Sequence, residues 1–181
     1  MKTIFVNLFA GPGAGKSTGA AYIFAKLKMA GINTEIVTEY AKDKVWEGAT
    51  KVFGCQFYVS GKQAFRMFRV NGKVEVAVSD SPVALGAMYT DDDCLKASCV
   101  NEQKKYRNLN FFIERATPYS QAGRYQNEEE AIAIDNRLKR FLDDNGFPFT
   151  CAKGDQDGFD SIVTTIKNEL AEHPAIEPWE R

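Results

Sequence analysis

Residues 10–18 are the feature of the sequence that most limits how this chain can fold. They read AGPGAGKST and directly follow the strand-like run TIFVNLF at residues 3–9. Three glycines let the backbone curl until successive N–H groups converge, and the helix that follows directs its positive dipole end to the same point. This pattern predicts a loop that binds the phosphates of a nucleoside triphosphate, placed between the first strand and the first helix of an α/β fold.

The positions of this loop have separate expected roles. Its backbone N–H groups contact phosphate oxygens, Lys16 reaches the β- and γ-phosphates, and the Ser17 hydroxyl is a ligand for Mg²⁺. The predicted nucleotide-binding residues of the loop are Gly11, Pro12, Gly13, Ala14, Gly15, Lys16, Ser17 and Thr18.

Strand-like and helix-like segments alternate along the 181 residues. Further strands are predicted at 34–40, 73–81, 109–114 and 147–152, and helices at 17–30, 49–70, 83–89, 94–106, 128–144 and 159–172. Such alternation predicts a single domain, residues 1–181, with a doubly wound parallel sheet and helices on both of its faces. The helical stretch 49–70 offers several apolar residues for burial against the sheet, namely Phe53, Phe57, Ala64, Phe65 and Phe68.

Ligands bind such sheets beyond the carboxyl ends of the strands, so the residues at those ends are the candidates for chemistry. Ionisable side chains follow four of the predicted strands, namely Lys16, Glu39, Asp80 and Arg115. Their combination suits phosphoryl transfer, which depends on positioning and electrostatics. Asp80 ends an apolar strand and is the candidate to hold Mg²⁺ beside the phosphate-binding loop. Glu39 is the candidate base for an acceptor hydroxyl, with Asp43 and Asp80 as alternatives.

Residues 116–127 lie between the predicted fourth strand and the helix 128–144, and they read ATPYSQAGRYQN. A glycine hinge and an arginine without apolar periodicity are typical of a lid that closes over a triphosphate. Arg124 is the candidate to stabilise charge in the transition state, with Arg115 as a second cation. Residues 39–72 are the expected acceptor region, and the substrate-binding candidates within it are Tyr40, Tyr58, Gln63 and Arg66.

Together these motifs resemble the P-loop nucleoside and nucleotide kinases. The nearest likeness is to nicotinamide riboside kinase-like domains and to small bacteriophage-encoded P-loop kinases or ATPases, through AGPGAGKST, TEYAKD, SDSP and PYSQAGRYQNEEEA. The resemblance implies an ATP-dependent phosphotransferase with five parallel strands in the order 2-3-1-4-5, ATP and Mg²⁺ as cofactors, and an acceptor site over the second and third strands. It also implies that adenine lies near Lys153 and Asp155.

Two departures from related kinases limit this resemblance. The Asp-Arg-Tyr signature of thymidylate kinases is absent, because the third strand ends in Asp80-Ser81-Pro82. The lid segment carries one clear arginine, whereas adenylate kinases have several. Both departures argue against a standard nucleoside monophosphate kinase.

The charges of the side chains nearly cancel, with 23 basic and 24 acidic residues. This balance favours a small nucleoside or nucleotide as the acceptor over nucleic acid. A kinase that acts on an end or a hydroxymethylated base of DNA or RNA is the alternative. An ATP-binding switch or ATPase with a protein partner is a further alternative, and self-association as a homodimer is left open.

The remaining sequence features concern metals and location. The four cysteines lack the spacing of a zinc site, so we expect reduced thiols and no structural zinc. The N-terminus does not read as a signal peptide, and no apolar stretch approaches the length that spans a membrane. The sequence therefore predicts a soluble cytoplasmic protein that makes no contact with membranes.

Overall fold

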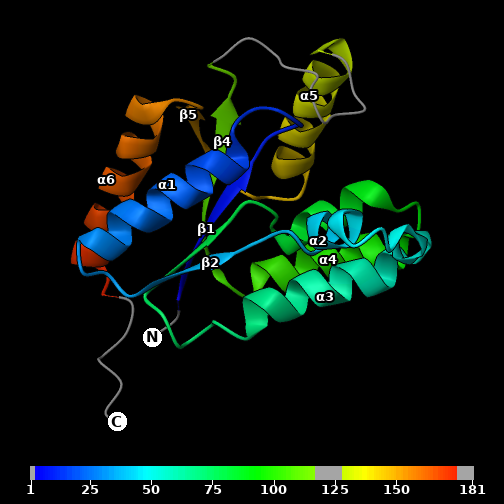
Figure 1. The fold of residues 1–181 in the computed structure, drawn as a ribbon, viewed down its shortest axis with the longest axis horizontal. Coiled ribbons are helices and arrows are strands. Elements are labelled where there is room, and N and C mark those ends of the chain that lie inside the picture. The colour runs from blue at the N-terminus through cyan, green and yellow to red at the C-terminus, as the bar shows by residue number, and fades with distance from the viewer. Residues whose placement is uncertain (1–2, 117–127, 175–181) are drawn as a thin grey trace.

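The computed structural model describes residues 3–116 and 128–174, and this part of the chain contains one five-stranded sheet (Figure 1). The strands are β1 Ile4–Phe9, β2 Thr34–Val37, β3 Val76–Ser79, β4 Arg107–Glu114 and β5 Thr150–Lys153. Every neighbouring pair is parallel, and the strand order is β2-β3-β1-β4-β5. The predicted fold class and strand order are confirmed.

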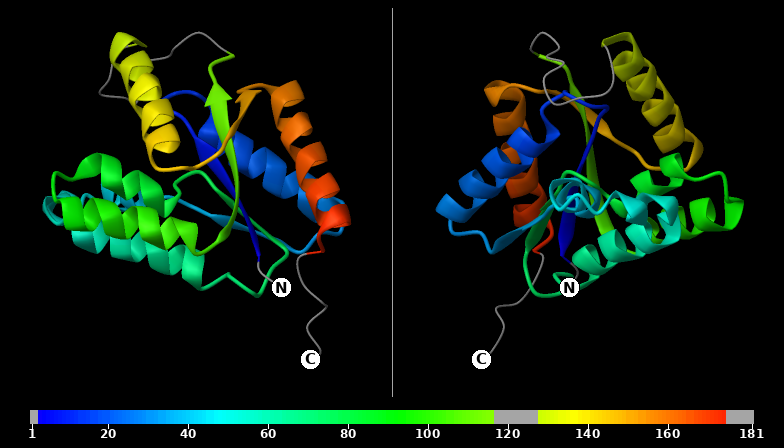
Figure 2. Two further views of the ribbon diagram at one scale, coloured as in Figure 1. Left: turned by 180° about the vertical axis from the view of Figure 1, so that it is seen from behind. Right: turned by 45° about the vertical axis from the view of Figure 1, so that its right-hand side comes forward.

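Helices cover both faces of the sheet (Figures 1 and 2). They are α1 Lys16–Met29, α2 Tyr40–Trp46, η1 Thr50–Gly54, α3 Gln56–Phe68, η2 Val83–Tyr89, α4 Asp93–Lys104, α5 Glu128–Asp144 and α6 Gln156–Glu172, where η marks a 3₁₀ helix. Helices α1 and α6 pack on one face, and α3, α4 and α5 pack on the other. Within the residues described, every helix is too short or too polar to cross a membrane.

Strand β1 shows why both faces need helices. Successive side chains of a strand point to opposite faces, and all six residues of β1 are buried. Ile4, Val6 and Leu8 belong to the core under α1 and α6. Phe5 and Phe9 belong to the cores under α3, α4 and α5. The near-continuous apolar run before the phosphate-binding loop is therefore the sequence of a central strand.

Some predicted elements differ from the structure between β2 and α4. The strand predicted at 34–40 ends at Val37, and Tyr40 begins helix α2, which the sequence pattern did not indicate. A tertiary contact fixes this start, because the backbone N–H of Tyr40 donates to Gln63 Oε1 over 2.8 Å. The single helix predicted at 49–70 is instead η1 followed by α3, and the helix predicted at 83–89 is the 3₁₀ helix η2.

The prediction that the phenylalanines of this region form core is wrong. Phe57, Phe65 and Phe68 are 73%, 61% and 65% exposed, and Phe53 in η1 is 38% exposed. Helix α3 carries a second stripe at helical spacing, and that stripe faces the sheet. It consists of Val59, Ser60, Gln63 and Met67, all buried. The phenylalanine stripe is the more apolar of the two and was expected to be buried. In the structure the less apolar stripe is buried instead, because it fits the tertiary packing.

Candidate functional site

The loop between β1 and α1 has the geometry of an anion-binding loop. Gly13 and Gly15 have φ angles of 80° and 94°, which other residues rarely adopt. Helix α1 begins at Lys16 with no capping side chain and no acidic residue in its first turn. The N–H groups at this helix start are therefore available to an anionic ligand, as a phosphate site requires.

Lys16 lies inside this loop. Its Nζ donates hydrogen bonds to the carbonyl oxygens of Ala10 (2.6 Å) and Gly11 (3.1 Å). Burial lowers the pKa of the Lys16 ammonium, and the nearby carboxylates of Glu39 and Asp80 act in the opposite direction. The cation is held at the mouth of the loop and faces two acids from the ends of neighbouring strands.

Ser17 and Asp80 meet as the sequence predicts. The Ser17 hydroxyl donates to Asp80 Oδ2 over 2.7 Å. The second oxygen of Asp80, Oδ1, is buried and has no hydrogen-bond partner among the residues described. A buried carboxylate oxygen without a partner requires an explanation, and a cation ligated there supplies one. The pair therefore fits a Mg²⁺ site, with the Ser17 hydroxyl and the Asp80 carboxylate as its protein ligands.

Glu39 lies between two cavities. The first has a volume of about 230 Å³ and is lined by the phosphate-binding loop, Lys16, Glu39 and Asp80. The second has a volume of about 330 Å³ and lies between η1, α3 and η2. Glu39 lines both cavities, and so do Ser81, Leu85 and Tyr89. The two cavities therefore adjoin at Glu39, so a ligand in one would lie next to a ligand in the other.

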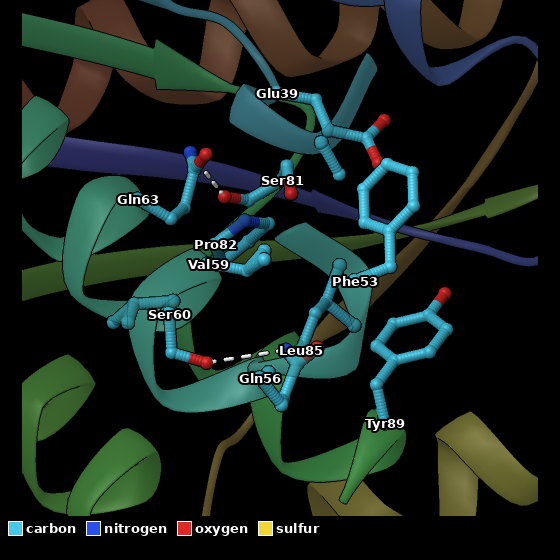
Figure 3. Close-up of a pocket in the computed structure, with 13 residues that line it drawn as sticks. Glu39, Phe53, Gln56, Val59, Ser60, Gln63, Ser81, Pro82, Leu85 and Tyr89 are labelled. Carbon is cyan, nitrogen blue, oxygen red and sulfur yellow. Dashed lines mark hydrogen bonds between the residues drawn. The ribbon is translucent and has the colours of Figure 1, made fainter. Parts of the chain in front are cut away.

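The second cavity joins polar ends to an apolar middle (Figure 3). Its lining residues are Glu39, Ala41, Phe53, Gln56, Val59, Ser60, Gln63, Ser81, Pro82, Val83, Leu85, Gly86 and Tyr89. Glu39 and Gln63 lie at one end in Figure 3, and Ser60 and Gln56 lie at the other, where Gln56 Nε2 donates to Ser60 Oγ over 3.2 Å. A small number of polar groups in a largely apolar cavity is typical of a site for a small ligand.

The environment of Glu39 favours a proton acceptor. The residue precedes the first turn of α2 with extended backbone angles. Burial raises the pKa of its carboxyl group above the ordinary value, the negative charge of Asp80 raises it further, and Lys16 lowers it. A carboxylate of raised pKa is a stronger base than an exposed one, which is the property expected of a general base.

Gln63 reaches the second cavity, but its amide is engaged in the fold. Oε1 accepts from the Tyr40 N–H, and Nε2 donates to the carbonyl oxygens of Ser81 (2.8 Å) and Thr38 (3.3 Å). These bonds connect the ends of β2 and β3 to α3. Gln63 thereby shapes one wall of the cavity.

The other three substrate-binding candidates are not among the residues that line the second cavity. Arg66 forms an ion pair with Asp43, and the hydroxyls of Tyr40 and Tyr58 lie 3.2 Å apart in the packing of α2 against α3. Asp43, the alternative base, is thus paired with a cation outside the cavity lining.

Arg115 and Asp135 contact the phosphate-binding loop from outside, and we call this pair the loop clamp. Arg115 Nη1 donates to the Pro12 carbonyl (2.6 Å), and Nη2 lies 2.9 Å from Asp135 Oδ2. Asp135 Oδ1 accepts the N–H of Gly11 over 2.5 Å. A Cβ atom at Gly11 would lie 2.7 Å from the same oxygen. Arg115 is therefore bound to the rim of the loop.

The sequence reading missed Asp135, although a signal was present. Asp135 is an acid next to the apolar stripe of α5, which is formed by Ala131, Leu138 and Leu142. A charged residue on the buried side of an amphipathic helix indicates a specific partner.

The turn between β5 and α6 lies against the phosphate-binding loop, where the resemblance places adenine. A Cβ atom at Gly154 would lie 2.5 Å from the carbonyl oxygen of Ala14. Asp155 caps α6 by accepting the N–H of Gly158 over 2.9 Å, and Lys153 is exposed at the end of β5. Arg124 and residues 117–127 of the predicted lid lie outside the residues that the structure describes.

Comparison with known proteins is consistent with this geometry. A family model described as an AAA domain matches residues 5–157, more than four fifths of the chain. The match includes the phosphate-binding loop, Glu39, Asp80 and the loop clamp. No curated protein matches the sequence.

Proposed function

This chain belongs to the AAA domain family, and on that premise we propose that it is a P-loop kinase for small molecules. It transfers the γ-phosphoryl group of Mg-ATP to a hydroxyl or phosphate group of a nucleoside, a nucleotide or a related compound. The observation that carries the kinase proposal is the position of Glu39, which lines the cavity at the phosphate-binding loop and also the second cavity. A protein that only hydrolyses ATP has no need of an acceptor cavity on the far side of its base.

The proposed reaction begins with an acceptor hydroxyl in the second cavity. Glu39 accepts its proton, and the oxygen forms a bond to the γ-phosphorus while the bond from that phosphorus to the β–γ bridging oxygen breaks. The products are the phosphorylated acceptor and ADP. Burial of Glu39 supports this role, because it raises the pKa of the base.

The nucleotide is held by this chain's own groups. Lys16 exchanges its hydrogen bonds to Ala10 and Gly11 for the phosphate oxygens, and the N–H groups at the start of α1 orient the phosphates. Ser17 and Asp80 would hold Mg²⁺, which neutralises charge on the phosphates when it is bound. The loop clamp fixes the rim of the loop through Gly11 and Pro12.

The test is consumption of Mg-ATP in the presence of nucleosides, nucleoside monophosphates, nicotinamide riboside and single-stranded DNA, each compared with a reaction without acceptor. We expect one class of small acceptor to stimulate turnover at least about tenfold and to appear as a phosphorylated product. Stimulation should disappear in Glu39→Gln, while ATP binding persists. Equal turnover with and without every acceptor would contradict the kinase proposal and indicate an ATPase.

A further inference from the structure

Helix α3 presents a row of exposed aromatic rings on the side away from the sheet. Phe57, Phe65 and Phe68 fall within about 80° of the helix circumference at about 100° per residue. All three are exposed, and the rings of Phe65 and Phe68 have centroids 6.4 Å apart. Exposed aromatic rings that share one face of a helix mark a candidate interaction surface.

A second row, with two cations, runs beside these rings. Tyr58, Lys62 and Arg69 are exposed and follow one another at helical spacing. Lys62 Nζ lies 5.4 Å from the centre of the Tyr58 ring. Phe65 borders both rows, so rings and positive charges lie side by side along about 16 Å of the helix, at about 1.5 Å per residue.

The positive charge is concentrated locally. Residues 40–73 include seven lysines and arginines and two acids, although basic and acidic side chains nearly balance over the whole sequence. Both acids are neutralised by neighbours in the same segment, Asp43 by Arg66 and Glu47 by Lys44. On the α4 side, Glu102 lines the groove that also holds Phe57, and it is paired with Lys105. The face of α3 that carries Lys62 and Arg69 therefore attracts an anionic partner.

We propose that this face of α3 binds single-stranded nucleic acid. Lys62 and Arg69 contact the phosphates, and unpaired bases stack on Phe57, Phe65 and Phe68. The inference goes beyond the proposed function, because such binding requires neither ATP nor a phosphoryl acceptor. The surface begins beside the second cavity, since α3 starts at Gln56, which lines that cavity.

Charge and ring chemistry favour this partner over the other candidates. A second copy of the chain, docked α3 against α3, would bring Lys62 and Arg69 close to the same cations of its partner. A duplex attracts the cations equally but hides the faces of its bases from the rings. An acidic protein helix would match the charge, but it would bind aliphatic side chains as well as aromatic ones, because such contacts need only apolar surface. Replacement of the phenylalanines by leucine therefore distinguishes the two partners: it should weaken the binding of a nucleic acid and leave the binding of a protein helix largely unchanged.

The experiment measures the fluorescence anisotropy of a labelled oligodeoxythymidylate of about 20 nucleotides with the nucleotide-free protein. The double variant Phe65→Ala/Phe68→Ala should weaken binding by a factor of about five to more than a hundred for each stacked base. Phe65→Leu/Phe68→Leu should weaken it nearly as much, because leucine keeps the apolar surface and removes the stacking. Ile132→Ala, at an exposed apolar position on α5, is the control and should bind like the unaltered protein.

Salt dependence tests the cations. Lys62→Glu should weaken binding and reduce the slope of log K against log salt by about 0.7 for the lost phosphate contact. Lys167→Glu, at an exposed position on α6, should change neither. Because all these positions are exposed, the variants should retain the unfolding temperature of the unaltered protein.

Three results would overturn the proposal. These are no binding of the oligonucleotide at low salt, unchanged binding by the leucine variant, and equal or tighter binding of a duplex or of polyglutamate. The kinase assay with small acceptors is independent of each of them, so failure of this inference is distinguishable from failure of the proposed function.

Discussion

The phosphate-binding loop and the outer face of α3 are built in opposite ways. On the nucleotide side the backbone is crowded: a Cβ atom at Gly154 or Gly19 would lie 2.5 or 2.6 Å from a neighbouring atom. On the outer face of α3, an added Cβ atom at Gly61 meets no neighbouring atom within 4 Å, and aromatic rings lie exposed. The wall of the second cavity is close-packed like the nucleotide side, since a Cβ atom at Gly86 would lie 2.5 Å from Ser60 Oγ. A loop whose N–H groups converge on phosphate must keep one backbone conformation, so its surroundings are close-packed. The outer face of α3 is open and constrains its own sequence less.

The largest expected effect comes from the cation at the centre of the crowded side. Lys16→Ala should lower turnover by about a thousandfold or more, because it removes the charge next to the β- and γ-phosphates. Steady-state kinetics measures the loss, and Lys167→Ala on α6 is the matched control. Turnover within tenfold of the unaltered protein would refute the assignment of the nucleotide site.

Glu39→Gln should lower the rate of transfer by about two to four orders of magnitude with ATP affinity largely kept. The glutamine keeps the shape of the side chain and removes its basicity. Asp43→Asn tests the alternative base and should leave the rate within about threefold, because Asp43 is paired with Arg66. The reverse pattern would assign the base to Asp43.

The acidic limb of the pH profile tests the same group. A general base acts as the carboxylate, so kcat/KM falls as the pH drops through the pKa of Glu39. Because burial raises that pKa, the decline should begin at a higher pH than for an exposed carboxylate, whose pKa is about 4.3. A profile flat down to the ordinary range of carboxylates would contradict this role.

The loop clamp should give an intermediate effect. Asp135→Ala removes one ion-pair partner of Arg115 and leaves the Gly11 N–H without the Asp135 acceptor, so we expect a loss of about 2 to 4 kcal/mol in the free energy of unfolding. Urea denaturation measures the loss, and the KM for ATP should rise because the rim of the loop is no longer held. Asp144→Asn, at an exposed position on the same helix, should change neither quantity. An unaltered unfolding midpoint for Asp135→Ala would show that the loop clamp does not stabilise the fold.

The smallest effects compare one glycine from each side. Gly158→Ala places a Cβ atom 2.1 Å from the Lys153 carbonyl oxygen, and should destabilise the protein by about 1 to 3 kcal/mol. Gly61 lies within helix α3, and an added Cβ atom there meets no neighbouring atom. Gly61→Ala should therefore stabilise the protein by about 0.4 to 1 kcal/mol. Thermal unfolding of the two variants measures both signs. Destabilisation by Gly61→Ala would show that the α3 side is less open than described.

The same contrast explains what the sequence could predict. The phosphate-binding loop and the alternation of strands and helices follow from patterns over short stretches of chain. The strand order was expected from the family resemblance, and the meeting of Ser17 with Asp80 from the rule that ligands bind at the carboxyl ends of parallel strands. The start of α2 at Tyr40 depends on Gln63, and the orientation of α3 depends on which of two helical stripes fits the sheet. Such choices are made by tertiary packing. Asp135 was missed for the same reason, because it contacts a residue 124 positions away in the sequence.

The packing leaves room for a side chain at position 11 or for the carboxylate of Asp135, but not for both. The space that a side chain at position 11 would fill is taken by the carboxylate of Asp135, and that carboxylate in turn needs the N–H of Gly11. Neither position can change alone without loss, so substitutions at the two sites should arise together in the evolution of the family. The size of side chain that position 11 of the phosphate-binding loop tolerates is therefore set by helix α5.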